Sequence, residues 1–258
     1  MDTGSIAVAD TPLLRYVLQR ADDALVLGHR LSEWCGHAPL MEEDMALSNM
    51  ALDLIGQARA LYSYAAAVEG AGRDEDAYAY LRDERAYGNL LLVERPNGDF
   101  ASTMVRQLLY AAYADPYWQR LSASTDPTLA AIAAKAKKEA AYHLRHAAEW
   151  VIRLGDGTAE SHARAQAALD DLWPYTGELF EASPSERELA AAGIVPELEA
   201  MRPAWRATVA EVAGTATLQV PADSWMQSGG RDGRHSEHLG HLLAVLQHMQ
   251  RSHPGATW

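Results

Sequence analysis

The residues of this chain that could carry chemistry are polar side chains on helix faces that are otherwise apolar. They fall in three stretches and comprise His29 and Glu33, Asp53 and Gln57, and Glu139 and His143. The members of the first two pairs are four residues apart, which stacks both side chains on one face of a helix. Carboxylates and histidines that project inward from facing helices can hold two metal ions, as in di-iron carboxylate proteins. One hypothesis is therefore a di-metal centre inside a helical bundle.

One position argues against an intact metal centre. Di-iron bundles place a Glu three residues before a ligand histidine, so that both side chains reach one metal ion. The residue three before His143 is Ala140, and no Glu-x-x-His sequence occurs on the four long predicted helices. The sequence thus favours a metal-free polar cluster, a degenerate di-iron pocket, over a di-iron or a mononuclear site. Its members are His29, Glu33, Asp53, Gln57, Glu139, Ala140 and His143.

A second candidate site lies in a segment that mixes charged, aromatic and amide side chains. It consists of Arg85, Ala86, Tyr87, Gly88 and Asn89. Arginine, tyrosine and asparagine together can contact an anionic, partly aromatic ligand such as a nucleotide tail. The simpler interpretation is a solvated helix end with local salt bridges, and both alternatives stay open.

Two clusters of basic or titratable residues have simple structural explanations. Lys135, Lys137 and Lys138 are predicted to face mostly water. Three histidines near the C-terminus are three residues apart, so they drift around a helix instead of converging on one metal ion. They are His235, His238 and His241, with Ser236 as the expected helix cap. We expect these histidines to face water or to hydrogen-bond to a neighbouring residue.

Composition excludes several classes of protein. The 258 residues contain 22 Lys and Arg against 35 Asp and Glu, a formal charge of −13, which disfavours general binding to nucleic acid or anionic membranes. The single cysteine, Cys35, leaves no internal disulfide and suits a reducing cytoplasm. No apolar run reaches the roughly 18–20 residues that span a bilayer. Residues 1–10 lack a signal pattern and are expected to form a short frayed leader.

Helical periodicity predicts the elements that must position these residues. Four long amphipathic helices are expected at about 12–35, 42–70, 100–121 and 127–154, and short connections between them indicate a four-helix bundle. A shorter, irregular helical segment is expected at 78–93. Further helices are predicted at 159–181, where Pro174 should kink or split the helix, from 183 onwards, at 203–216 and at 235–251, with a loop at 220–234. The prediction is one all-α domain over 1–258, with a bundle core at about 12–155 and C-terminal helices at about 159–252.

Several stretches together resemble a known family. They are residues 31–39, 52–59, 82–85, 89–94, 96–98, 138–140, 142–145 and 237–240. The chain resembles the C subunits of bacterial phenylacetyl-CoA epoxidases, the ring 1,2-epoxidases of aerobic phenylacetate degradation. The match runs from about residue 13 to Trp258. It implies a ferritin-like fold, from whose unbroken helices Pro174 departs.

The resemblance also implies a role without chemistry of its own. In that family the C subunit is a structural partner of a ferritin-like catalytic A subunit, which carries Glu-x-x-His and the di-iron centre, and it also contacts a small B subunit. A reductase with flavin and iron–sulfur groups supplies electrons, and oxygen and phenylacetyl-CoA are the substrates. The expectations are therefore a cytoplasmic chain with no metal or cofactor of its own. It should meet phenylacetyl-CoA only indirectly and expose an apolar face, which self-association into a homodimer could cover when the chain is isolated.

Two rival functions remain open on sequence grounds. The chain could be a divergent carboxylate-bridged di-metal oxidase, active in its own right through Glu33, Asp53, Glu139 and His143. It could also be a module that binds the CoA tail through Arg85, Tyr87 and Asn89 while its partner performs the chemistry.

Overall fold

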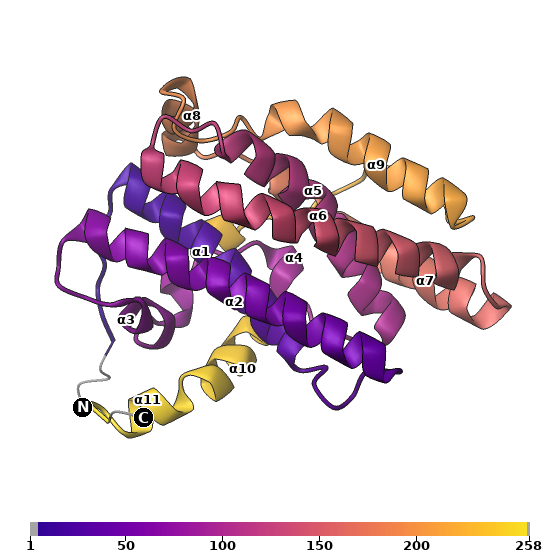
Figure 1. Ribbon diagram of the computed structural model, residues 1–258, viewed down its shortest axis with the longest axis horizontal. Helices are drawn as coiled ribbons and strands as arrows, with labels where there is room; N and C mark the ends of the chain where they lie inside the picture. The colour runs from indigo at the N-terminus through magenta and orange to yellow at the C-terminus, as the bar shows by residue number, and fades with distance from the viewer. Residues whose placement is uncertain (1–4, 257–258) are drawn as a thin grey trace.

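Four long helices form the centre of the molecule. A computed structural model describes residues 5–256, and all regular structure in this range is helical, with no strand. The bundle consists of α1 (Pro12–Ser32), α2 (Met41–Glu69), α5 (Phe100–Leu121) and α6 (Pro127–Gly155) (Figure 1). This confirms the all-α prediction and agrees with a ferritin-like four-helix bundle.

Local sequence signals explain where the bundle helices begin and end. Asp126 caps α6, since its carboxylate accepts from the backbone N–H of Thr128 and of Leu129 at 2.9 and 3.0 Å. Helix α2 starts with an acidic turn, which suits the positive end of the helix dipole, and ends at Gly70 in the left-handed conformation. Helix α1 begins at Pro12, whose fixed backbone suits the first turn of a helix, and the hydroxyl of the preceding Thr11 makes no capping hydrogen bond.

The four helices form two tightly packed pairs. Helix α1 packs mainly against α2, and α5 packs mainly against α6, while α2 and α6 meet along a seam with fewer contacts. Gly28 permits the close approach of α1 to α2, because a Cβ there would lie 3.1 Å from the side chain of Ile55. Buried alanines at Ala133, Ala136 and Ala147 give α6 a narrow inner face.

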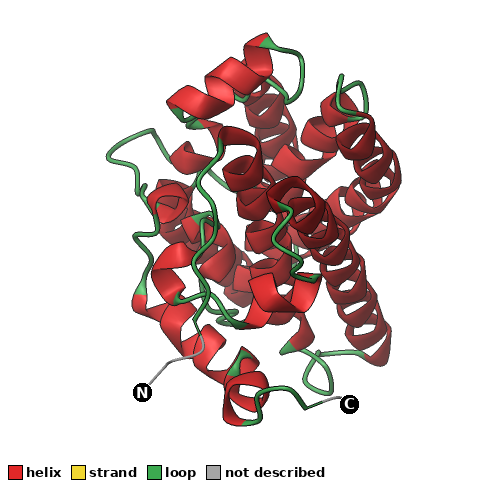
Figure 2. Cartoon of the chain, turned by 90° about the vertical axis from the view of Figure 1, so that its left-hand side faces the viewer, coloured by secondary structure: helices red, strands yellow, loops and turns green. Residues whose placement is uncertain are grey.

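Short helices surround the bundle (Figures 1 and 2). They are α3 (Glu75–Tyr80), α4 (Leu91–Glu94), α7 (Ala159–Leu172), α8 (Pro184–Ala191), α9 (Arg202–Thr215), α10 (Glu237–Leu246) and α11 (His248–Ser252). Single 3-10 turns lie at 84–86, 173–175, 177–180, 199–201 and 230–232. Helices α7 and α9 pack on α5 and α6, whereas α4 and α8 pack on α1. None of the helices in residues 5–256 has the length and apolar character that crossing a bilayer requires.

Three predicted helices are shorter than expected. The segment at 159–181 is α-helical only to Leu172, and two 3-10 turns follow, of which the first contains Pro174, so the predicted split is confirmed. The segment at 78–93 contains only the end of α3, the 3-10 turn at 84–86 and most of α4. The last helix begins at Glu237 and is interrupted at Gln247, and Ser236 caps it without a side-chain hydrogen bond.

The prediction of a frayed leader is wrong for residues 5–10. The backbone N–H of Ile6 donates to the carbonyl of Leu81 at 2.9 Å, and that of Ala9 donates to the carboxylate of Glu69 at 2.9 Å. These bonds hold an extended strap against the bundle. Residues 1–4, which belong to the same prediction, and residues 257–258 lie outside the described part of the chain.

Candidate functional site

A small cavity lies at the position where the sequence lacks a carboxylate. Its volume is about 10 Å³, which is room for about one water molecule. It is enclosed by α2, α5 and α6 and lined by Leu54, Gln57, Gln107, Tyr110, Ala111, Ala114, Trp118, Ala140 and His143. Ala140 is almost fully buried, and Gln107 Oε1 has no hydrogen-bond partner. The missing side chain at residue 140 therefore leaves a void in the bundle core.

Two polar pairs connect α2 and α6 beside this cavity. His143 Nε2 lies 3.1 Å from Asp53 Oδ2, with the histidine buried and the carboxylate about one-third exposed. Gln57 donates from Nε2 to Glu139 Oε2 at 2.9 Å. The structure thus brings together the predicted residues of α2 and α6, and each ionisable group has a partner across the seam.

His29 and Glu33 lie apart from this cavity. Glu33 is exposed and accepts from Arg30 Nη1 at 2.8 Å and from Asn97 Nδ2 at 3.0 Å. Burial lowers the pKa of His29, and the charge of Glu33 opposes that shift only in part. Neither residue lines the cavity or bonds to the pairs between α2 and α6. Glu33 is bonded instead to the turn at Asn97.

The segment proposed to contact a nucleotide tail is divided between interior and surface. Tyr87, Gly88 and Asn89 are buried, whereas Arg85 and Ala86 are exposed. The Tyr87 hydroxyl donates to the carbonyl of Ala79, and burial raises its pKa to about 12. Gly88 donates its N–H to Asp22 Oδ2 at 2.8 Å. The three buried residues are therefore committed to contacts within the chain, and Arg85 is the charged side chain that remains accessible.

The largest polar feature is not predicted from the sequence and centres on two adjacent acids of α1. Asp22 is fully buried and accepts from Tyr62 at 2.6 Å and from the guanidinium of Arg82. Asp23 accepts from Arg231 Nη2 at 2.7 Å and from the N–H of Leu90 at 2.8 Å. These contacts fix the segments around residues 82–90 and 231 on α1.

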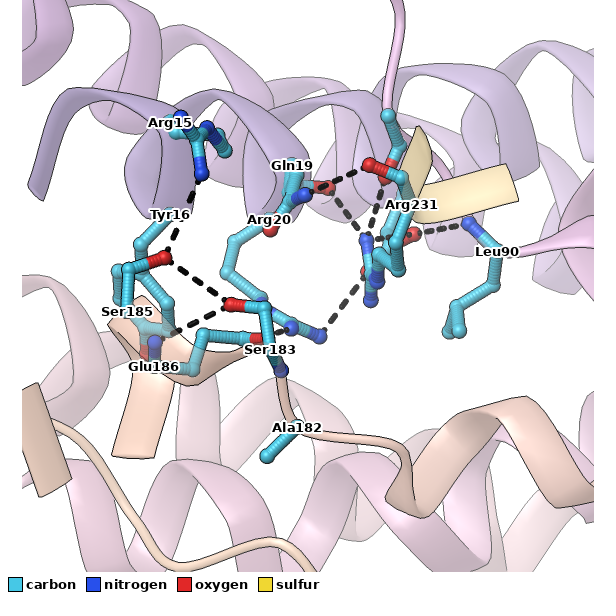
Figure 3. A network of polar contacts seen from close by, with 12 residues as sticks. Arg15, Tyr16, Gln19, Arg20, Leu90, Ala182, Ser183, Ser185, Glu186 and Arg231 are labelled. Carbon is cyan, nitrogen blue, oxygen red and sulfur yellow. Dashed lines mark hydrogen bonds and ion pairs between the residues drawn. The ribbon is translucent and has the colours of Figure 1, made fainter. Parts of the chain in front are cut away.

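The same network reaches α8, as Figure 3 shows. Arg20 Nη2 lies 2.7 Å from Glu186 Oε1, and Glu186 also accepts from the N–H of Ser183 as part of the capping box of α8. Burial opposes the ionisation of Glu186, but the charge of Arg20 and further contacts outweigh it, so the pKa of this carboxyl is lowered. Arg20 also lies over the ring of Tyr16, at 5.4 Å from its centre. The ion pair therefore docks α8 onto α1.

Two further buried acids bind the C-terminal loop. Glu178 accepts from the N–H groups of Gly229 and Gly230 at 2.9 and 2.7 Å. Glu94 accepts from the N–H of Ser236 at 2.6 Å, and its Oε2 lies 2.9 Å from His235 Nδ1. His235 is thus hydrogen-bonded to a neighbour, as expected. The sequence carries little signal for this network, because Asp22 and Asp23 lie on an amphipathic helix whose polar side chains, by their spacing alone, are expected to face water.

Comparison with known proteins places the chain in a family. The sequence profile of the family described as phenylacetic acid catabolic protein matches residues 2–258. The chain belongs to this family. A curated relative from Escherichia coli (strain K12), named as the C subunit of 1,2-phenylacetyl-CoA epoxidase, is 49% identical over 246 residues. The alignment covers 95% of this chain and 99% of the relative, and it confirms the resemblance found from the sequence motifs.

The residues of this member of the phenylacetic acid catabolic family do not fit a two-metal centre. Such a centre needs about four carboxylates and two histidines around the ions. Of the nine residues that line the cavity, His143 alone is a His, Cys, Asp or Glu. Over residues 5–256, no three residues of these types lie close enough together to hold a metal ion. The geometry instead provides hydrogen-bonded links between helices.

Proposed function

We propose that this chain is the non-catalytic C subunit of a multicomponent phenylacetyl-CoA 1,2-epoxidase, a monooxygenase of aerobic phenylacetate degradation in the cytoplasm. The near full-length relative supports membership of such an assembly. The observation that carries the non-catalytic role is the cavity at Ala140. It stands where a di-iron bundle has its metal-binding carboxylate, and its lining supplies one histidine and no carboxylate.

The proposal assigns the chemistry to other subunits. A catalytic A subunit of similar fold would hold the di-iron centre and bind oxygen and phenylacetyl-CoA. A small B subunit would contact the pair, and a reductase with flavin and iron–sulfur groups would deliver electrons. This chain would hold no cofactor of its own and would affect phenylacetyl-CoA only through its partner.

The links between α2 and α6 support a scaffolding role in physical terms. In a di-iron bundle the metal ions tie facing helices together through their ligands. Here the hydrogen bonds of the His143–Asp53 and Gln57–Glu139 pairs connect α2 and α6. A bundle connected in this way keeps a fixed shape without metal, which a subunit that supports a catalytic partner requires.

Metal analysis of the purified chain tests the proposal. The chain is incubated with ferrous iron under anaerobic conditions, freed of unbound metal by gel filtration and assayed for iron. We expect the wild type to retain iron far below one equivalent. The variant His143→Gln should retain the same background amount. Stoichiometric iron that His143→Gln and Asp53→Asn each remove would instead establish the rival di-metal oxidase with Glu33, Asp53, Glu139 and His143.

A second assay tests the alternative that the chain binds the CoA tail, which the exposure of Arg85 keeps open. In the reconstituted epoxidase, the proposal predicts that Arg85→Ala leaves KM for phenylacetyl-CoA and turnover unchanged. An increase in KM at unchanged turnover would assign substrate binding to this segment. Arg120→Ala is the matched control, because Arg120 is also an exposed arginine.

A further inference from the structure

The aromatic side chains of this chain are almost all tyrosine and tryptophan. The sequence contains 11 Tyr and 7 Trp but only 2 Phe. The buried tyrosines of residues 5–256 are Tyr16, Tyr62, Tyr78, Tyr87, Tyr110, Tyr113 and Tyr117. A buried hydroxyl costs free energy unless it is hydrogen-bonded, so packing alone would favour phenylalanine at such positions. Tyrosine also differs from phenylalanine in its chemistry, because its phenol ring can lose an electron to a strong oxidant.

Two of these tyrosines form a stacked pair between neighbouring helices. Tyr62 belongs to α2 and Tyr78 to α3, which packs against α2 (Figure 1). Their ring centres lie 6.1 Å apart, and the ring planes are inclined by 13°. The hydroxyl of Tyr62 donates to Asp22 Oδ1 at 2.6 Å, and that of Tyr78 donates to Glu69 Oε2 at 2.6 Å. Each phenol of the pair therefore has a carboxylate in direct contact.

This arrangement suits the removal of one electron from a phenol. Loss of the electron makes the hydroxyl strongly acidic, so the proton has to leave together with the electron. Burial and the bond to Glu69 raise the pKa of Tyr78 to about 12, so this phenol still carries its proton at neutral pH. A base accepts a proton directly when it lies within about 2.6–3.2 Å of the donor atom. The carboxylate of Glu69 meets that condition.

The two carboxylates differ as proton acceptors. Asp22 is the counter-ion of Arg82, and both side chains are buried. Protonation of Asp22 would leave the charge of Arg82 uncompensated in the interior, which is strongly unfavourable. Glu69 pairs instead with Arg73, whose side chain is 26% exposed, so water can stabilise the charge of Arg73 after Glu69 takes up a proton. The proton should therefore move to Glu69, and Tyr78 should be the ring that becomes the radical.

A third tyrosine bonds to a carboxylate but lacks the other features of the pair. The hydroxyl of Tyr64 is hydrogen-bonded to Asp126. Asp126 also caps α6, and the N–H groups of Thr128 and Leu129 that it accepts favour its ionised form. Within residues 5–256, no second aromatic ring stacks on Tyr64. Tyr64 thus provides an internal comparison for the stacked pair.

We propose that Tyr62 and Tyr78 form a one-electron redox site. A strong one-electron oxidant removes an electron from the stacked pair, the O–H bond of Tyr78 breaks, and its proton passes to Glu69 Oε2. The products are a neutral tyrosyl radical, a protonated Glu69 and the oxidant reduced by one electron. Tyr62 is the adjoining ring from which an electron vacancy deeper in the bundle passes to Tyr78.

The oxidants that this site would meet are oxygen-derived radicals. An oxygen-activating complex can release them, and on this point the inference rests on the proposed function. The site would take up such an oxidising equivalent at a defined pair of rings, before it damages other side chains of the core. The chemistry of the pair belongs to this chain alone, so it can be measured without any partner subunit.

Electron paramagnetic resonance of the full-length chain tests the redox site. The metal-free chain is oxidised with photogenerated ruthenium(III) tris-bipyridine and frozen after a delay in which radicals at the surface decay. The wild type should retain a tyrosyl signal. Tyr78→Phe keeps the ring but removes the hydroxyl, and it should lose most of this signal. Glu69→Gln keeps a hydrogen-bond acceptor but removes the base, and it should lose the signal although Tyr78 is present.

Matched controls separate the pair from other tyrosines. Tyr64→Phe removes a phenol that is bonded to a carboxylate but not stacked, and Tyr142→Phe removes a phenol at the surface of α6. Both variants should keep the wild-type signal. Circular dichroism and urea midpoints show which variants are folded. If Tyr78→Phe does not fold, Glu69→Gln and Tyr62→Phe decide, and Tyr62→Phe should lower the yield of the same signal.

Three results would overturn the redox site. They are the absence of a lasting tyrosyl signal in the wild type, a signal that survives in folded Tyr78→Phe or Glu69→Gln, and a signal that only Tyr64→Phe removes. Each of these leaves the proposed function intact, because the isolated chain is measured. Stoichiometric iron in the metal analysis would instead overturn the non-catalytic role and leave the radical at Tyr78 unaffected.

Discussion

At the scale of single residues, Ala140 shows how a lost ligand can leave a trace in packing. Helix periodicity predicts His143 on the inner face with Ala140 in place of a carboxylate one turn before it, and both residues are buried in the structure. What the sequence does not indicate is the void of about 10 Å³ at this point. Voids depend on side chains from three helices, and one helix alone does not reveal whether its neighbours fill the space.

Two glutamines on this cavity should respond differently to the same substitution. Gln57→Met removes the bond to Glu139 and should destabilise the chain by about 1 kcal/mol. Gln107→Met removes an oxygen that has no partner, so the free energy of unfolding should stay the same or rise slightly. Urea denaturation of both variants measures the difference. A larger loss of unfolding free energy in Gln107→Met than in Gln57→Met would contradict this assignment of hydrogen-bond partners.

The network around Asp22 and Asp23 shows a limit of reasoning from single helices. Both acids lie on a helix with an apolar stripe, and their spacing alone does not distinguish solvated from buried side chains. Their partners Arg82 and Arg231 are 60 and 208 residues away in the sequence. Pairing over such separations depends on the tertiary fold, whereas helix periodicity is local. The predicted site residues therefore come from short spacings, and the largest polar cluster is missed.

Neutralising Asp22 should be among the most damaging single changes in the chain. Asp22→Asn would leave the buried guanidinium of Arg82 without its carboxylate, at a cost of about 3–5 kcal/mol. Asp10→Asn is the control, since Asp10 pairs with Arg15 at the surface and should matter by less than about 1 kcal/mol. Chemical denaturation compares the two. Similar losses of unfolding free energy in both variants would show that burial does not determine the strength of the Asp22–Arg82 pair.

At the scale of elements, the long helices are predicted well and the short ones poorly. Helices α1, α2, α5 and α6 have periodic apolar faces and local start or stop signals such as Asp126 and Gly70. The segment 78–93 has an apolar composition that suits a helix. There, however, the backbone N–H groups of Gly88 and Leu90 bond to Asp22 and Asp23 instead of to helical carbonyls. The carboxylates of α1 thus accept the hydrogen bonds that backbone carbonyls would accept in a helix.

The contact between His235, which lies just before α10, and Glu94 should stabilise the fold more at acidic pH than at alkaline pH. Burial lowers the pKa of His235, but hydrogen bonds to Glu94 and to the carbonyl of Tyr87 outweigh it, so the pKa lies above its ordinary value. A raised pKa in the folded chain contributes stability below the unfolded value of about 6.5. That contribution is lost as the pH rises through the folded pKa.

The variant His235→Gln isolates this effect. The difference in free energy of unfolding between wild type and His235→Gln should be largest at acidic pH and shrink toward alkaline pH. His29, whose pKa is lowered, titrates in the opposite sense but is present in both chains and cancels in the difference. Urea midpoints over a pH series measure it. A difference that grows with pH would show that Glu94 does not stabilise protonated His235.

At the scale of the whole molecule, the C-terminal loop completes the interior of the bundle. Arg231 pairs with Asp23 of α1 and also donates to the carbonyl of Gly88 at 2.7 Å. His235 bonds to Glu94, which is fully buried. The bundle and the C-terminal helices thus share buried charges, which favours the predicted single domain over two units that fold separately. An all-α chain whose core depends on residues far apart in the sequence gains stability only when both parts are in place.

Removal of residues 217–258 should therefore unfold the bundle as well. Without Arg231 and His235, the carboxylates of Asp23 and Glu94 lose partners, and each such loss costs about 3–5 kcal/mol. Two losses of this size approach the total stability of a typical protein, about 5–15 kcal/mol. In the full chain, circular dichroism and tryptophan fluorescence should report one shared unfolding midpoint, because tryptophans lie in both parts. A fragment ending at residue 216 should give no cooperative transition. Native-like near-ultraviolet dichroism from that fragment, or two separate midpoints in the full chain, would instead show that the bundle folds without the C-terminal loop.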